Sequence, residues 1–254
     1  MGRPSSAAAW REARLPTGGK GRLVALLSAP LSACVRLIPH ASRVRGVLRL
    51  SVPIAFAART LGHGALTSGL SVRERAIGRL LSMLHYRRVA YSADISVVNG
   101  AASTGPLLLL VRHSLLNQLL ISRLVHDGQQ VTAVMSQVDG HASTFGVDAP
   151  LDVLDTSAML MRSVAKRLEA RRIVIIAIDG TAPSHGYTKI DTPTGPWFVT
   201  DQPIRLALKR GIPIAVAVHD IKRDHVVTEI RRLAGDDADA IISGFCDAYG
   251  CSRT

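Results

Sequence analysis

One histidine stands where an apolar run gives way to a helical pattern. Residues Leu107 to Val111 are all apolar, they follow a Gly-Pro turn signal, and Arg112, His113 and Ser114 come next. A short apolar run bounded by turn residues is typical of a buried strand. His113 would then lie at the carboxyl end of that strand, where open α/β sheets bind ligands. Because an imidazole accepts a proton near neutral pH, His113 is a candidate general base.

A second polar group follows the strongest strand signal in the chain. Ile173 to Ile178 is an uninterrupted apolar run, and Asp179, Gly180 and Thr181 come directly after it. Strand ends that are close in a parallel sheet would place Asp179 on the same rim as His113. Position alone also allows simpler interpretations, in which the histidine caps a strand and Asp-Gly is a turn.

Gln118 comes five residues after His113, where a helix would bring its side chain back toward the ring. Its amide can form a hydrogen bond with an imidazole, but it carries no charge to stabilise an imidazolium. Further along, the segment after Asp179 contains hydrogen-bond donors, among them Thr181 and Lys189. These residues complete the set whose types and positions suit a site at this rim.

The elements needed to position these residues can be read from hydrophobic periodicity. An apolar helical face over 114–126 between strands 107–111 and 131–136 predicts a β-α-β unit with parallel strands. The remaining pattern predicts an α/β domain with a mixed, largely parallel sheet flanked by helices. We expect strands at 86–98, 173–178 and 212–218, an edge strand at 226–230, helices at 155–172, 202–209 and 236–249, and loops at 137–154 and 182–199.

The positive charge is concentrated in the first part of the chain. Residues 1–100 contain 15 Lys and Arg against 3 Asp and Glu, whereas residues 101–254 contain 16 of each kind. We expect a disordered tail at 1–21, a basic amphipathic helical segment at 22–85, and an α/β domain at 86–254. Arginines among aliphatic residues are typical of helices that lie in a membrane interface. The alternative is that these helices pack on the domain itself with solvated arginines.

Several kinds of chemistry are poorly supported by the sequence. It contains no H-E-x-x-H motif, no Cys/His set for zinc, no G-x-S-x-G elbow and no G-x-G-x-x-G after a strand. We therefore expect no metal and no permanently bound cofactor. The basic segment has few aromatic residues to stack on bases, which argues against nucleic acid. The three cysteines show no pairing pattern, and we expect a cytoplasmic protein attached peripherally to the inner face of the membrane.

Taken together, these stretches resemble the superfamily of glycerolipid and lipid A-type lysophospholipid acyltransferases. The similarity is to the branch of lauroyl-type lipid A and mannoside acyltransferases and covers roughly residues 86–230. V-R-H-S-L-L-N-Q stands where the family has an H-x4-[D/E] motif after an apolar strand, and I-A-I-D-G-T stands where it has a strand ending in an acidic element. The stretch T-P-T-G-P-W-F-V-T-D-Q-P-I-R-L-A-L-K-R-G-I-P-I-A-V-A-V resembles the loop, short helix and Gly-x-Pro strand of the family.

The resemblance implies an acyltransferase. His113 would deprotonate a hydroxyl or amine of a lipid or small-molecule acceptor, which then attacks the thioester of an acyl carrier protein or coenzyme A. Asp179, Gly180 and Thr181 would help to bind the acceptor or donor. Lys189 and the N-terminal arginines would be candidates for contacts with phosphate or pantetheine.

This chain departs from the family pattern at Gln118, which occupies the place of the acidic residue. Three interpretations remain open. The chemistry tolerates a neutral partner, another acid such as Asp179 serves, or the activity has been lost. The last would make the protein a catalytically inactive relative that binds lipid or acyl carrier.

Overall fold

The structure is a computed structural model that describes residues 46–53, 77, 95–99, 105–114, 116–135, 151–180, 186–191, 196–222 and 225–250. The expected disordered tail at 1–21 and most of the expected basic segment lie outside these residues. Within that segment, residues 46–53 are helical, with Val47, Leu48 and Ser51 buried. No helix in the described ranges is long and apolar enough to cross a membrane.

Helices are interleaved with strands along the described parts of the chain, with up to four strands in succession between two helices. In order they are β1 (Ile95–Asn99), β2 (Leu107–Val111), α5 (Asn117–His126), β3 (Val131–Met135), β4 (Asp152–Asp155), α6 (Leu160–Glu169), β5 (Ile173–Ala177), β6 (Asp179–Gly180), β7 (Tyr187–Ile190), β8 (Trp197–Thr200), α7 (Gln202–Lys209), β9 (Ile214–Ile221), β10 (Val226–Arg232) and α8 (Ala238–Ala248).

Seven strands form one sheet in the order β1-β10-β9-β2-β5-β3-β4. All its described pairings are parallel except that between β9 and β10. The α/β class with a mixed, largely parallel sheet is therefore confirmed. β2 lies between β9 and β5, so the strand that leads to His113 is central. A separate antiparallel sheet of β6, β8 and β7 follows β5.

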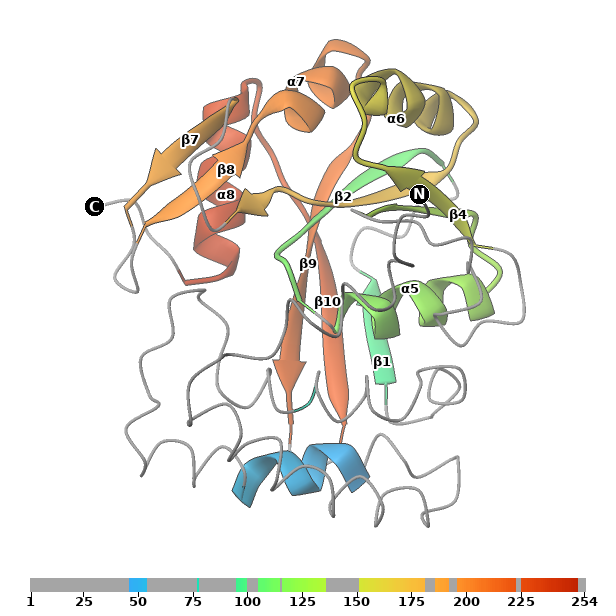
Figure 1. Ribbon diagram of the computed structural model, residues 1–254, viewed down its shortest axis with the longest axis vertical. Helices are drawn as coiled ribbons and strands as arrows, with labels where there is room; N and C mark the ends of the chain where they lie inside the picture. The colour runs from blue at the N-terminus through green and yellow to red at the C-terminus, as the bar shows by residue number, and fades with distance from the viewer. Residues whose placement is uncertain are drawn as a thin grey trace, which may run out of the picture.

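The side chains of β2 alternate between two apolar cores. Leu108 and Leu110 pack in a cluster with buried residues of α6, α7 and α8, whereas Leu107, Leu109 and Val111 pack in a second cluster with α5. Successive strand residues point to opposite faces, so a strand buried on both sides is apolar throughout. Figure 1 shows α8 and α5 on opposite sides of the strands. The arrangement is a three-layer α/β/α domain.

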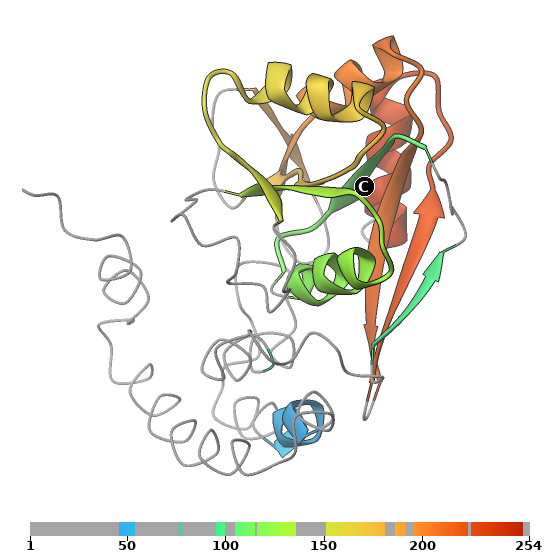
Figure 2. The ribbon, with the colours of Figure 1, turned by 90° about the vertical axis from the view of Figure 1, so that its right-hand side faces the viewer.

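Three regions of the two sheets differ from expectation. The predicted edge strand at 226–230 is β10, which is not an edge because β1 pairs in parallel with it (Figure 2). The predicted loop at 137–154 ends in a strand, β4, which pairs with β3. Likewise the predicted loop at 182–199 contains β7 and part of β8. These strands are only four residues long, and such short runs give little periodicity to detect.

Candidate active site

The structure brings His113 and Asp179 into direct contact at the carboxyl end of the central strands. The Nδ1 atom of His113 lies 2.9 Å from Oδ1 of Asp179. The same oxygen also accepts a hydrogen bond from the His113 backbone N–H, at 2.7 Å. One carboxylate oxygen therefore fixes both the backbone and the ring of His113. The sequence prediction that these two residues share a rim is confirmed by this geometry.

The central strands explain why two residues so far apart in sequence meet. β2 and β5 are parallel neighbours, with Val111 opposite Ala177. The Ile178 N–H donates to the Val111 carbonyl, which extends the pairing by one step beyond the strands. Asp179 then enters the small sheet, where it pairs with Val199 of β8. The backbone of Asp179 therefore lies at the junction of the two sheets.

The hydrogen bond from Asp179 sets the electrostatics of the histidine. It raises the pKa of His113 above the usual 6.5, and the negative charge of Asp179 adds to this, while partial desolvation of the ring by neighbouring atoms acts in the opposite direction. An ionised carboxylate can only accept hydrogen bonds, so Nδ1 of the neutral ring carries the proton. The lone pair is consequently on Nε2, the nitrogen that a general base would use.

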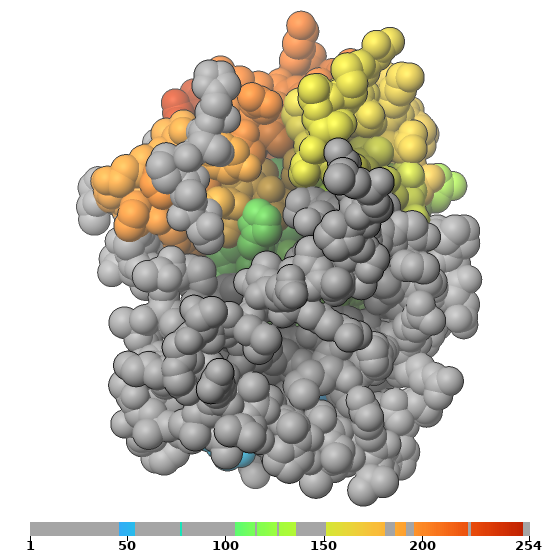
Figure 3. Space-filling view, viewed as in Figure 1, coloured from blue at the N-terminus to red at the C-terminus, as the bar shows by residue number. Residues whose placement is uncertain are grey.

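The histidine is open to solvent, whereas its partner is not. The His113 side chain is 68% exposed and that of Asp179 is 14% exposed. In the space-filling view, part of the green segment that covers residues 105–135 reaches the surface beside the orange segment that carries β7 and β8 (Figure 3). A base with this exposure can be reached by a large acceptor, and its orienting acid stays shielded.

Arg112, the residue before His113, is packed against aromatic rings. Its guanidinium carbon lies 5.8 Å from the ring centre of Trp197 and 5.1 Å from that of Tyr249. Cations at these distances are attracted by the electrons of an aromatic face. The Arg112 backbone N–H donates to the Tyr249 hydroxyl at 3.2 Å, and that hydroxyl donates to the Ala217 carbonyl at 2.6 Å. The sequence gives no signal for these contacts, which join residues more than 30 positions apart.

A second histidine, His219, lies between β9 and the start of α5. His219 of β9 contacts Asn117 through Nε2 at 2.8 Å and Thr228 through Nδ1 at 2.9 Å. Both ring nitrogens of His219 therefore have partners, and the side chain is not exposed. Its surroundings lower its pKa to about 4, mainly because burial disfavours the charged ring and also because Arg112 is nearby. His219 is thus neutral at physiological pH and differs from His113 in this respect.

Gln118 lies in the first turn of α5, as predicted, but it does not contact His113 in the structure. Its Oε1 atom is buried and has no hydrogen-bond partner among the described residues. α5 begins at Asn117, three residues later than expected, and the Ser114 hydroxyl accepts a hydrogen bond from the Leu116 N–H just before the helix. Asp179 occupies the position at Nδ1. A catalytic role for Gln118 stays a prediction.

The other predicted binding residues are only partly placed. Gly180 is in β6, where an added Cβ would meet the Tyr187 ring at 3.1 Å, so glycine permits this close approach. Lys189 is in β7 and forms an exposed ion pair with Asp191 at 2.8 Å. Both Gly180 and Lys189 pair with Phe198, which puts them two strand spacings apart, about 10 Å. Thr181 lies outside the described residues.

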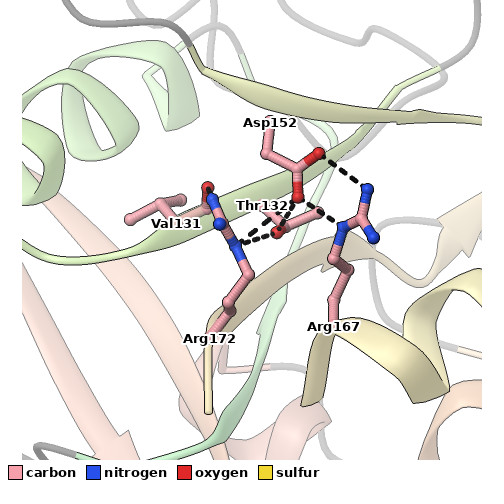
Figure 4. A network of polar contacts seen from close by, with 5 residues as sticks. All are labelled: Val131, Thr132, Asp152, Arg167 and Arg172. Carbon is pink, nitrogen blue, oxygen red and sulfur yellow. Dashed lines mark hydrogen bonds and ion pairs between the residues drawn. The ribbon is translucent and has the colours of Figure 1, made fainter. Parts of the chain in front are cut away.

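A different polar cluster occupies the amino ends of the strands (Figure 4). Asp152 of β4 accepts hydrogen bonds from Arg167 at 2.6 and 3.1 Å and from the Thr132 hydroxyl at 2.7 Å. Arg172 donates to Thr132 and to the Val131 carbonyl, both at 2.9 Å, and lies 3.5 Å from Asp152. This amino-end cluster joins β3 and β4 to the segment that enters β5. It is on the rim opposite His113.

Comparisons with known proteins give no assignment for this site. No family model matches the chain, and a search of curated proteins finds no match. Among the described residues, no group of three or more His, Cys, Asp or Glu side chains is placed to hold a metal ion. The candidate site therefore rests on its own geometry.

Proposed function

We propose that the protein is an acyltransferase that moves an acyl group from a thioester donor to a hydroxyl or amine. The observation that supports this most strongly is the His113–Asp179 pair, an exposed imidazole with its Nδ1 on a shielded carboxylate. This is the arrangement that general-base activation of a nucleophile requires. It also favours one of the three interpretations of Gln118, in which Asp179 takes the place of the missing acidic partner.

In the proposed reaction, Nε2 of His113 accepts the proton of the acceptor hydroxyl or amine while the acceptor attacks the thioester carbonyl. The tetrahedral intermediate collapses and expels the thiolate of the donor. The imidazolium then returns its proton to the sulfur, so the ring ends each cycle neutral. Asp179 stabilises the imidazolium in the interval, since its charge lies 2.9 Å from Nδ1.

The substrates follow from the same proposal. The donor is an acyl carrier protein or acyl-coenzyme A, and the acceptor is a lipid or small molecule. Gly180, Thr181 and Lys189 would contribute to their binding, with Lys189 available for a phosphate. The basic residues within 22–85 would hold the protein peripherally on the inner, cytoplasmic face of the membrane, whose lipids are anionic. No nucleic acid and no permanent cofactor form part of the proposal.

The decisive experiment compares wild type with His113→Ala. Mass spectrometry of lipids and metabolites is expected to reveal a product that accumulates on expression of the wild type and is lost in the variant. With purified protein, thiol release from acyl-coenzyme A and acyl carrier protein is followed with a panel of acceptors. General-base catalysis contributes about 10²- to 10⁴-fold, so the variant should lose at least that much.

The matched control is Thr132→Val, which alters the opposite rim and should keep full turnover. Wild-type-like transfer by a folded His113→Ala protein would exclude the proposed mechanism.

A second candidate function is that of an inactive relative that binds acyl donor or lipid. The observation that favours it is Gln118, which lacks a charge where the resembled family has an acid and which does not contact the ring. Such a protein would bind a donor saturably and release no thiol. Binding isotherms measured beside thiol release therefore separate the two functions.

A further inference from the structure

The loop between β2 and α5 is anchored by side chains on elements distant in sequence. The Asn117 amide donates from Nδ2 to the Arg112 carbonyl at 2.8 Å, immediately before His113. Its Oδ1 atom faces Nε2 of His219 at 2.8 Å. His219 in turn contacts the Thr228 hydroxyl, at the directly opposite position on β10. A continuous row of hydrogen bonds therefore leads from the sheet to the peptide that carries the candidate base.

The Arg112 carbonyl at the start of this row determines which atom donates in every following hydrogen bond. A carbonyl can only accept, so the amide nitrogen of Asn117 must face Arg112 and its oxygen must face His219. That oxygen also only accepts, so Nε2 of His219 must donate. In the neutral ring Nδ1 is then an acceptor, and the Thr228 hydroxyl donates to it. Burial, which lowers the pKa of His219 to about 4, keeps the ring in this neutral form.

We propose that His219 and Asn117 are positioning residues that hold the 112–114 turn so that the His113 ring meets Asp179. The catalytic importance of His219 and Asn117 rests on the proposed acyl transfer. Their effect on the position of the His113 ring is independent of that function. Arg112 is held at its carbonyl by Asn117 and at its N–H by Tyr249, and the next N–H, of His113, is held by Asp179. Three consecutive backbone groups are thus fixed by side chains.

The side chains act through the backbone, so their loss should change the geometry of His113 without removing any reacting group. A displacement of about 1 Å from the productive geometry can lower catalysis about 100-fold. In Asn117→Ala we expect kcat to fall about 10- to 100-fold with little change in KM. We also expect the pKa of the His113 ring to fall toward 6.5, since its hydrogen bond to Asp179 loosens.

The test is a titration of the histidine rings by NMR, made on the full-length protein. Wild type, Asn117→Ala and Thr228→Val are compared with Thr132→Val. The two threonine variants are matched, because each removes the hydroxyl of a residue that is at most 1% exposed and lies on a strand of the same sheet. Thr228→Val should shift the His113 titration in the same direction as Asn117→Ala, by a smaller amount. Thr132→Val should leave it unchanged at a comparable thermal midpoint.

The outcomes separate this inference from the proposed function. A His113 titration that is the same in wild type, Asn117→Ala and Thr228→Val overturns the positioning role, whatever the activity. A wild type that releases no thiol from any donor, with a titration that still shifts in the variants, overturns acyl transfer and retains the positioning role. If Asn117→Ala does not fold, the comparison of the two threonine variants decides alone.

Discussion

The two rims of the sheet each hold a carboxylate at a strand end, but the carboxylates are used differently. At the amino ends, Asp152 is surrounded by two guanidinium groups and a hydroxyl (Figure 4). At the carboxyl ends, the only hydrogen-bond partner of the Asp179 carboxylate in the described part of the chain is His113, which it contacts through one oxygen. Arginine stays charged at all relevant pH values, whereas histidine gains and loses its proton near neutrality. The first cluster suits fixed structure and the second suits proton transfer.

The pKa values express the same contrast. Burial alone would raise the pKa of Asp152, but the hydrogen bonds from Arg167 and Thr132 and the charges of both arginines outweigh it, and the pKa is lowered. The pKa of His113 is raised. Partners thus favour the charged form in both places, the imidazolium of His113 and the carboxylate of Asp152.

The largest expected effect comes from removing the carboxylate at the active rim. Asp179→Ala should lower transfer about 10²- to 10⁴-fold, because the ring loses both its orientation and the stabilisation of its charge. Asp179→Asn should lose less, since an amide oxygen can still accept the two hydrogen bonds. Initial rates of thiol release measure both. Equal loss in the two variants would show that orientation by hydrogen bonds contributes nothing without the charge.

The corresponding change at the amino-end cluster should affect stability instead. Asp152→Ala leaves the Arg167 guanidinium and the Thr132 hydroxyl without their shared acceptor, which should lower the free energy of unfolding by about 1–3 kcal/mol. Denaturant unfolding measures this loss. Transfer at a temperature below the transition should stay at the wild-type rate. A large loss of transfer in folded Asp152→Ala would contradict the division of roles between the rims.

The two rims should also respond to pH in opposite windows. The pKa of His113 is raised in the folded state, so its contribution to stability is fully present below pH 6.5 and is lost as pH rises through the folded value. The pKa of Asp152 is lowered, so its contribution is present above 3.8 and is lost as pH falls through the folded value. Unfolding free energies are measured across pH for wild type and both variants. His113→Ala should lose the pH dependence that His113 contributes, and Asp152→Ala should lose the one that Asp152 contributes.

The smallest effect is expected at Gln118. Its Oε1 atom is buried without a hydrogen-bond partner in the described ranges, so Gln118→Leu should change stability by no more than about 1 kcal/mol, in either direction. Gln118→Glu should leave transfer unchanged or raise it. Thermal unfolding and thiol release check the two. A strong loss of transfer in Gln118→Leu would give this residue a role in catalysis after all.

The sequence is sufficient for the parts of the fold that depend on strong local patterns. β2 and α7 match their predicted bounds, and the rim shared by His113 and Asp179 follows from the parallel order of two apolar runs. Short strands such as β4 escape prediction because four residues do not establish a period. The burial of His219 escapes it for another reason. Its partner Asn117 is 102 positions away, and no spacing in the sequence reveals that contact.

The double hydrogen bond at Asp179 has a consequence for chemical rescue. One of its two bonds is to the backbone N–H of residue 113, which any residue except proline provides. The carboxylate would therefore keep its orientation in His113→Gly or His113→Ala and would face an emptied, solvent-open space. Imidazole added in solution can occupy such a space and present its own N–H to Asp179. The rate of restored transfer would then rise with the concentration of added imidazole, because the protein would bind imidazole beside Asp179.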